Sequence, residues 1–225
     1  NEKYVTNGNT KIDSTVPPIA GNLAIVVFDT SNEQHRVATE ITPLSISANE
    51  VVDGPYIFFD AQGRLTNISM IDGVVKKIKL PLVSGTQQIS TTIPALPRVV
   101  ITKVTASTPA DYFPMPPKLL SVSDIEGNLD HLIQFLQFHN VIDSEYNWSW
   151  GENQLLFNGD SVDRGDHVTQ LLWFVRKLQQ QAIKVGGNVH FVLGNHEAMI
   201  LADDIRYTHP KYKFVAKRMG IPYHN

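Results

Sequence analysis

The spacing of three polar motifs constrains the fold of this chain more than any other feature. The motifs are Ser-Asp-Ile-Glu-Gly-Asn at 123–128, Gly-Asp-Ser-Val-Asp-Arg-Gly at 159–165 and Gly-Asn-His-Glu at 194–197. Each follows a short apolar run, and Asp124, Asp160 and Asn195 are separated by 36 and then 35 positions. Such a distance holds a strand, a helix and a strand, and parallel strands place their carboxyl ends at one edge of a sheet. The spacing therefore predicts that the three motifs meet.

The residues around the motifs favour alternating strands and helices. Short apolar runs predict strands at 119–122, 154–157 and 189–193. Amphipathic runs predict helices at 129–140 and 168–185. We therefore expect an α/β region over residues 119–225, with a parallel sheet and crossover helices.

The first half of the chain has a different pattern. Residues 1–18 are polar and end in two prolines, which favours an extended arm. Residues 19–107 hold β-branched and aromatic runs separated by turn sequences, which predicts a small antiparallel β domain of unknown role. The expected strands lie at 23–28, 56–59, 65–70, 74–80 and 99–104. Four prolines in 108–118 exclude a helix there, so this segment is the predicted linker.

The amino-acid composition excludes several kinds of catalytic site and binding surface. The 225 residues include no cysteine, so thiolate nucleophiles, disulfides and zinc-thiolate sites are excluded. The net charge is -3, and the lysines at 76, 77 and 79 form only a short group, so a nucleic-acid surface is not expected. No apolar run approaches the roughly 20 residues of a membrane span. The polar start at Asn1, together with the lack of cysteine, favours an exported protein, periplasmic or extracellular, with a cytoplasmic location as the alternative.

The oxygen-bearing side chains of the motifs suit a pair of divalent metal ions. Carboxylate, amide and imidazole groups bind Mn, Fe or Zn, and one carboxylate can join two such ions. Asp160, in the middle motif, is the expected bridge, with Asp124 on the first ion and Asn195 on the second. Such a pair lowers the pKa of a bound water and stabilises the charge of a phosphoryl group, so the motifs predict phosphate hydrolysis by metal hydroxide.

Three further side chains of the motifs fit that reaction. The planar guanidinium of Arg164 can bind phosphate oxygens with two donors. His196 can give a proton to the leaving oxygen, and Asp163 can hold its imidazole in the required tautomer. Any single Asp after a strand is usually a helix cap, but the three motifs in this order favour a site.

The second and third motifs resemble those of the calcineurin-like metallophosphoesterase family, in its Ser/Thr-phosphatase branch. Residues 123–128 through 204–207 are similar to a bacterial group of that family that includes a cold-active protein-tyrosine phosphatase. The resemblance covers roughly residues 117–215. It implies metallophosphoesterase-type sheet layers, of which this chain holds the first half, and a dimetal phosphomonoesterase with Asp124, Asp160 and Asn195 as ligands.

Two positions depart from the family pattern. The family has His two residues after the first Asp, whereas this chain has Glu126, which can bind a metal or only accept hydrogen bonds near the site. The family also takes histidines from a later half of the domain, and this chain ends at Asn225. We therefore expect a remaining C-terminal segment or a partner chain to complete the metal site.

The resulting prediction is a metal-dependent phosphatase that acts on a phosphorylated substrate, with phosphomonoesters, phosphoproteins among them, as the expected class. A phosphodiesterase or nucleotide pyrophosphohydrolase on the same scaffold is one alternative. A non-catalytic binding module with a decayed site is the other, because Glu126 and the missing histidines would fit it.

Overall fold

The computed structural model describes residues 24–28, 38–43, 47, 50–80, 86–93, 96–102, 110 and 112–223. The chain separates into two compact units, residues 1–47 and 48–225. In the first unit, β1 (Ala24–Phe28) and β2 (Ala38–Pro43) form an antiparallel pair with a bulge at Val27 and Phe28. The predicted arm at 1–18 lies outside the described residues.

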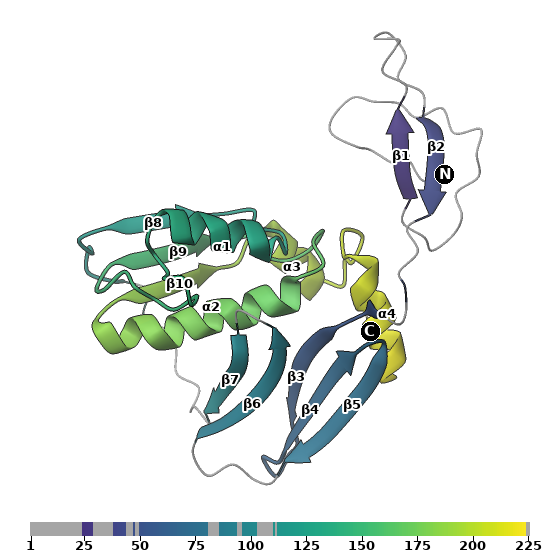
Figure 1. Ribbon diagram of the computed structural model, residues 1–225, viewed down its shortest axis with the longest axis horizontal. Helices are drawn as coiled ribbons and strands as arrows, with labels where there is room; N and C mark the ends of the chain where they lie inside the picture. The colour runs from purple at the N-terminus through teal and green to yellow at the C-terminus, as the bar shows by residue number, and fades with distance from the viewer. Residues whose placement is uncertain are drawn as a thin grey trace. The chain divides into compact units, whose positions relative to one another are not determined.

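Antiparallel strands open the second unit (Figure 1). A three-stranded sheet has β3 (Asp53–Phe59), β4 (Leu65–Ile71) and β5 (Val74–Leu80) in the order β3-β4-β5. β6 (Thr86–Ile93) and β7 (Leu96–Thr102) form a separate pair. The predicted antiparallel β region is confirmed by the pairing of these strands. Asp72 and Gly73, both with positive φ, connect β4 to β5. The proposed domain limits, with a linker at 108–118, stay predictions.

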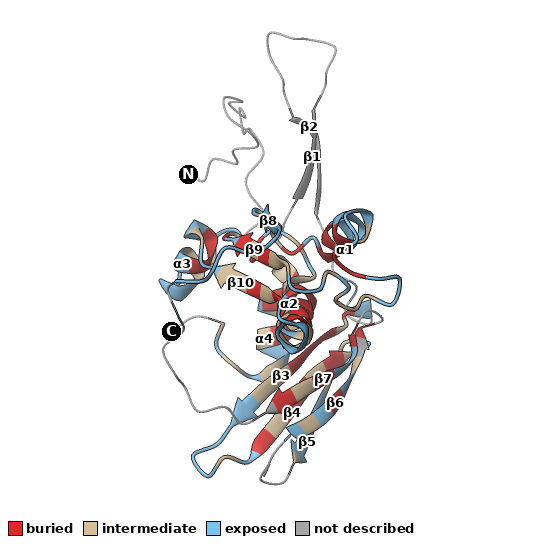
Figure 2. Ribbon diagram, turned by 90° about the vertical axis from the view of Figure 1, so that its left-hand side faces the viewer, coloured by how far each residue is buried: buried red, intermediate tan, exposed pale blue. Residues whose placement is uncertain are grey.

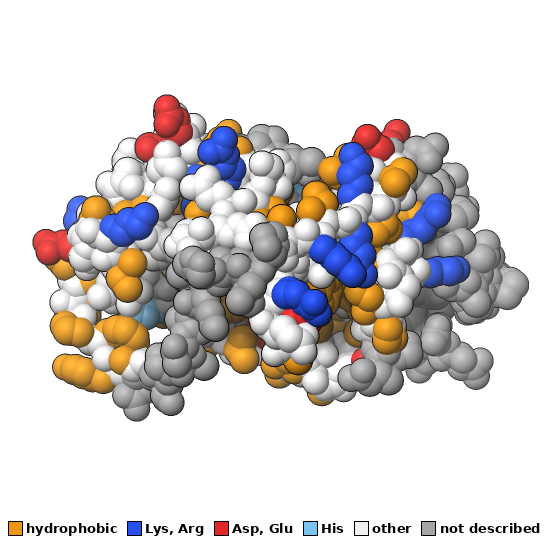
Figure 3. Space-filling model, turned by 90° about the horizontal axis from the view of Figure 1, so that it is seen from below, with side chains coloured by type: hydrophobic (Ala, Val, Ile, Leu, Met, Phe, Trp, Pro, Cys, Tyr) orange, Lys and Arg blue, Asp and Glu red, His pale blue; other side chains and the backbone are white. Residues whose placement is uncertain are grey.

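The surface of this β region carries dispersed positive charge. β5 exposes its three lysines, Lys76, Lys77 and Lys79. On the face shown in Figure 3, Lys and Arg side chains lie between hydrophobic and neutral side chains. In the described residues, no helix is long and apolar enough to cross a membrane.

A parallel sheet follows, as the sequence predicts. It has the order β10-β9-β8, with β8 (Leu119–Val122), β9 (Gln154–Asn158) and β10 (Asn188–Val192). The helices α1 (Leu129–Phe138) and α2 (Val168–Ala182) form the two crossovers. Two further helices come after the sheet, α3 (Asn195–Leu201) and α4 (Pro210–Met219). The predicted α/β class is confirmed; the first helix ends earlier than predicted, and a 3-10 turn (Ile183–Val185) follows the second.

One hydrophobic core joins this sheet to both crossover helices. Leu155 and Phe157 point to the same side of β9 and are fully buried with Leu132 of α1 and Phe174 of α2. The buried positions of α2 lie on the side of the helix that faces the strands (Figure 2). Both crossover helices therefore cover one face of the sheet.

A buried polar cluster connects β3 to helices of the α/β region. The side chain of Asp53 has no exposed area, and it accepts hydrogen bonds from Gln170 of α2, at 3.1 Å, and from Tyr56. Lys211 of α4 lies 3.3 Å from the same carboxylate and also donates to the carbonyl of Asp166. Burial, with the Asp53 charge, raises the pKa of the Tyr56 phenol, so the phenol remains a donor. The carboxylate of Asp53 therefore connects β3 to both α2 and α4.

Replacing the buried carboxylate should destabilise the fold. Asp53→Ala leaves Lys211 without its charged partner in a buried site, which typically costs about 3 to 5 kcal/mol. Urea unfolding of the variant and the wild type measures this loss. Arg64→Ala, which removes an exposed ion pair with Asp60 but keeps the turn hydrogen bonds of that carboxylate, is the matched control and should leave the midpoint almost unchanged. Equal midpoints for all three proteins would contradict the proposed importance of the cluster.

Candidate active site

The three motifs meet at the carboxyl edge of the parallel sheet, as their spacing predicts. The first motif runs beside the second, because the backbone N–H groups of Asp124 and Glu126 donate to the carbonyls of Gly159 and Asp160 at 3.3 and 3.0 Å. The third motif reaches the second where the N–H of His196 donates to the Asp160 carboxylate at 2.8 Å. Asp160 therefore lies between the other two motifs.

The backbone of the motifs adopts an unusual conformation. Positive φ angles of 48 to 72° occur at five non-glycine residues of the first two motifs: Asp124, Glu126, Asp160, Asp163 and Arg164. Left-handed conformations of such residues cost on the order of 1 to 3 kcal/mol each and persist where the surrounding structure holds them, often at functional sites. This clustering supports a functional reading of the two loops.

Glycines allow the loops to approach one another. A Cβ on Gly159, whose φ is 85°, would lie 2.6 Å from the Cα of Gly194. A Cβ on Gly194 would overlap the carboxylate of Asp160. Side chains at either position would separate the second motif from the third, which explains why both motifs contain glycine.

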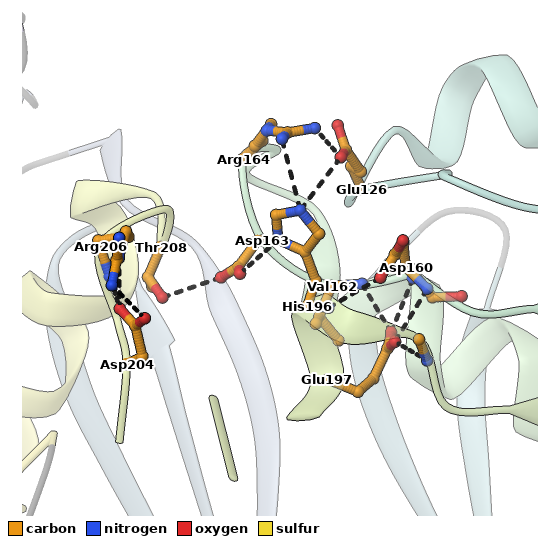
Figure 4. A network of polar contacts seen from close by, with 12 residues as sticks. Glu126, Asp160, Val162, Asp163, Arg164, His196, Glu197, Asp204, Arg206 and Thr208 are labelled. Atoms are coloured by element: carbon orange, nitrogen blue, oxygen red, sulfur yellow. Dashed lines mark hydrogen bonds and ion pairs between the residues drawn. The ribbon is translucent and has the colours of Figure 1, made fainter. Parts of the chain in front are cut away.

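The carboxylate of Glu197 binds the second and third motifs together (Figure 4). It accepts hydrogen bonds from the backbone N–H groups of Asp160, Ser161 and Val162 at 2.8, 2.7 and 3.2 Å. It also accepts one from Gly194, at the start of its own helix, at 2.7 Å. Burial raises the pKa of this carboxyl, but the hydrogen bonds outweigh that effect, so its pKa lies below the ordinary value. Glu197 is therefore a charged structural link.

His196 and Asp163 form a buried pair. Nδ1 of His196 lies 2.9 Å from Oδ2 of Asp163, and the two residues are 5% and 2% exposed. Because a carboxylate only accepts, Nδ1 carries the proton of this hydrogen bond. The other oxygen of Asp163 accepts from the hydroxyl of Thr208 at 3.0 Å. Nε2 of the imidazole is left to face Arg164 and Glu126.

Arg164 lies above this pair with its side chain about half exposed. Its guanidinium pairs with the carboxylate of Glu126 and lies 3.4 Å from Nε2 of His196. The ring of Tyr207 lies against the guanidinium, and the ring centroid is 5.4 Å from Cζ of Arg164. The backbone carbonyl of Tyr207 accepts a hydrogen bond from the backbone N–H of Arg164 at 3.0 Å. The predicted phosphate-binding and proton-transferring groups are thus brought together.

The predicted metal ligands Asp124 and Asp160 lie on neighbouring loops, and Asn195 begins α3; together they do not make a complete set of donors. Asp124 and Asn195 are exposed, and neither side chain has a hydrogen-bonding partner among the described residues, while Asp160 uses one carboxylate oxygen. A pocket lined in part by Asp124 and Asn128 opens beside the first motif. In the described part of the chain, no three His, Asp or Glu side chains converge as a metal site. Two carboxylates and one amide fit part of such a site by their chemistry.

Two residues at this site had no clear signal in the sequence. Tyr207 belongs to the segment 204–207 that carries part of the family resemblance, and Thr208 follows it. Neither residue is a typical ligand or acid, and both lie more than forty positions from the second motif.

The side chain of Asn128 turns back toward the first motif and donates to the carbonyl of Ile125 at 3.0 Å, so it shapes the first loop.

Comparison with known proteins connects this site to phosphoesterases. Residues 117–224 match the family model of the calcineurin-like phosphoesterases. Shewanella-like protein phosphatase 2 of Arabidopsis thaliana is 32% identical over 99 residues, 44% of this chain and 25% of that protein. Shewanella-like protein phosphatase 1 of Plasmodium berghei is 37% identical over 95 residues, 42% of this chain and 26% of that protein. The chain thus spans about a quarter of the length of these relatives.

A solved structure extends the similarity. The crystal structure of the cold-active protein-tyrosine phosphatase of a psychrophilic Shewanella species has a TM-score of 0.66 and 32% identity. The match covers 77% of this chain and 52% of that one. Residues 117–224 make up less than half of the 225 residues, so a structural match over 77% of the chain also includes part of the β region. The predicted resemblance to calcineurin-like metallophosphoesterases is confirmed.

The Glu197 link predicts a pH-dependent stability difference. Glu197→Gln removes a charged acceptor of several buried N–H groups and should lower the free energy of unfolding by about 1 to 3 kcal/mol near neutral pH. The folded-state pKa of Glu197 lies below 4.5, so its contribution is complete above that pH and is lost as the pH falls through the folded-state pKa. Denaturant unfolding at several pH values measures the difference, which should shrink in acid. Glu145→Gln, at an exposed position, is the control, and a pH-independent deficit in Glu197→Gln would contradict the ionic role.

Proposed function

We propose that this chain provides part of the active site of a metal-dependent phosphatase that hydrolyses phosphomonoesters. The observation that carries the proposal is the buried His196–Asp163 pair, with Nε2 of the imidazole 3.4 Å from the guanidinium of Arg164. Folding alone does not require a buried imidazole and carboxylate next to a half-exposed guanidinium. The similarity to proteins named as phosphatases supports the same reaction class.

Arg164 would bind the phosphate group of the substrate. Its planar guanidinium offers parallel donors that match two phosphate oxygens. The Glu126 carboxylate pairs with this guanidinium, so a phosphate would take the place of that carboxylate. The backbone of Arg164 is held by the carbonyl of Tyr207, which fixes where the side chain starts.

His196 would donate the proton that the leaving group needs. As the P–O bond breaks, its electron pair stays on the leaving oxygen, and the proton on Nε2 moves to that oxygen. Asp163 keeps the ring oriented through Nδ1 and stabilises the protonated imidazole before the transfer. The imidazole becomes neutral, a water supplies the new oxygen on phosphorus, and the products are an alcohol or phenol and inorganic phosphate.

Asp124, Asp160 and Asn195 would hold the metal ions, with Asp160 shared between two of them. Bound divalent ions of Mn, Fe or Zn would lower the pKa of a water and balance the charge of the phosphoryl group. The contact of Glu126 with Arg164 favours the second of its two expected roles, that of a neighbouring group rather than a ligand. The remaining ligands would come from a further segment or a partner chain, and an exported location stays a prediction.

The substrate class can be tested together with metal dependence. The intact protein should hydrolyse p-nitrophenyl phosphate in the presence of added Mn and lose this activity with a chelator. Bis(p-nitrophenyl) phosphate should react much more slowly; a strong preference for it would indicate the phosphodiesterase alternative. Asp160→Asn should bind less metal by elemental analysis and be inactive, because it removes a shared ligand. Full activity of that variant would contradict the metal assignment, and absence of metal and activity from the wild type would favour a binding module.

His196→Ala separates proton transfer from metal binding. The variant should retain metal by elemental analysis but lower kcat by roughly 10² to 10⁴ for substrates whose leaving group needs a proton. His190→Ala, on β10 and next to Gln154, is a control that removes another imidazole. An unchanged rate in His196→Ala would remove this residue from the mechanism.

A further inference from the structure

The carboxylate of Asp163 depends on one hydroxyl from outside the three motifs. The Asp163 side chain has no exposed area, so water does not supply hydrogen bonds to it. Its Oδ2 atom accepts from His196, and in the described residues its Oδ1 atom accepts from Thr208 alone, at 3.0 Å. Thr208 is itself 5% exposed. The two partners together fix the plane of the carboxylate.

The structure holds Thr208 firmly from both sides. Its N–H donates to the carbonyl of Ile205 at 3.2 Å, and the preceding Tyr207 carbonyl accepts from Arg164. On the other side α4 begins, and Lys211 in its first turn reaches the buried Asp53 of β3. The Tyr212 hydroxyl of the same helix accepts from the N–H of Val168 at 2.6 Å, which joins α4 to the start of α2. Thr208 therefore lies on a fixed part of the backbone.

We infer that Thr208 is a positioning residue for proton transfer by His196. This inference rests on the proposed phosphatase function. With Thr208 on Oδ1, the Asp163 carboxylate cannot rotate, and its Oδ2 atom stays 2.9 Å from Nδ1 of the imidazole. The imidazole then keeps Nε2 toward the guanidinium of Arg164, where the phosphate and its leaving oxygen would lie. The Thr208 hydroxyl donates to Asp163, and Thr208 therefore acts on the imidazole through this carboxylate.

Loss of the hydroxyl should affect substrates in proportion to their need for a proton. Thr208→Val has nearly the same shape as the wild type but cannot donate. The p-nitrophenolate of p-nitrophenyl phosphate leaves readily without a proton, whereas the phenolate of phenyl phosphate does not. We expect kcat of Thr208→Val to fall about tenfold for phenyl phosphate and less than about twofold for p-nitrophenyl phosphate, with KM nearly unchanged, because only part of the general-acid effect is lost.

Matched variants separate this role from a purely structural one. Thr208→Ser keeps the hydroxyl and should restore the wild-type ratio of the two kcat values. Thr91→Val removes a hydroxyl that hydrogen bonds in the β6–β7 hairpin and should leave the ratio unchanged. Partial unfolding lowers both kcat values equally, so the ratio does not depend on the folded fraction. If Thr208→Val does not fold, Thr208→Ala is measured in its place.

A spectroscopic measurement tests the geometry without turnover. The Nδ1 proton of His196 should give a downfield NMR resonance in the wild type, Thr208→Ser and Thr91→Val, and this resonance should shift upfield or broaden in Thr208→Val. An unchanged resonance, or equal losses of kcat for both substrates, would overturn the inference about Thr208. A wild-type protein that has the resonance but hydrolyses neither substrate would instead overturn the proposed function.

Discussion

The carboxylate of Glu197 is the interaction on which the arrangement of this site depends. It accepts backbone N–H groups from the second motif and from the start of α3, so it joins loops that lie 35 positions apart in the chain. Without it, several buried donors would have no partner, and unpaired buried donors are costly. The positions of Asp160 and His196 follow from this link, because both residues belong to the segments that it joins.

The loops of the first and second motifs store backbone strain. Hydrogen bonds between neighbouring loops offset the free-energy cost of the left-handed conformations. Glycines let these loops come close enough to form the hydrogen bonds. The strain has a consequence for the side chains, because it aims Asp163 inward and Arg164 outward from adjacent positions. A buried carboxylate and a half-exposed guanidinium therefore face the same imidazole from two directions.

The β region before the family match contributes to the same arrangement. Asp53 of β3 contacts α2 and α4, and α4 follows the segment that holds Thr208 and Tyr207. Trp173 of α2 donates to the carbonyl of Pro55, which adds a second contact between the strand and the helix. The structural similarity to the Shewanella phosphatase covers 77% of this chain, more than residues 117–224 alone, so it also includes part of the region before the family match.

The sequence by itself determined the alternation of strands and helices between residues 119 and 193, the parallel sheet and the meeting of three motifs at its edge, because periodicity and spacing can be read along the chain. It did not predict β2, β6, α3 or α4. It also indicated His196, Asp163 and Arg164, since the residue types carry the chemistry. Only the tertiary structure decided that Glu126 pairs with Arg164, that Thr208 holds Asp163 and that Asp53 connects β3 to two helices. These contacts join residues 38 to 158 positions apart, and side-chain packing across elements, which no local pattern records, brings them together.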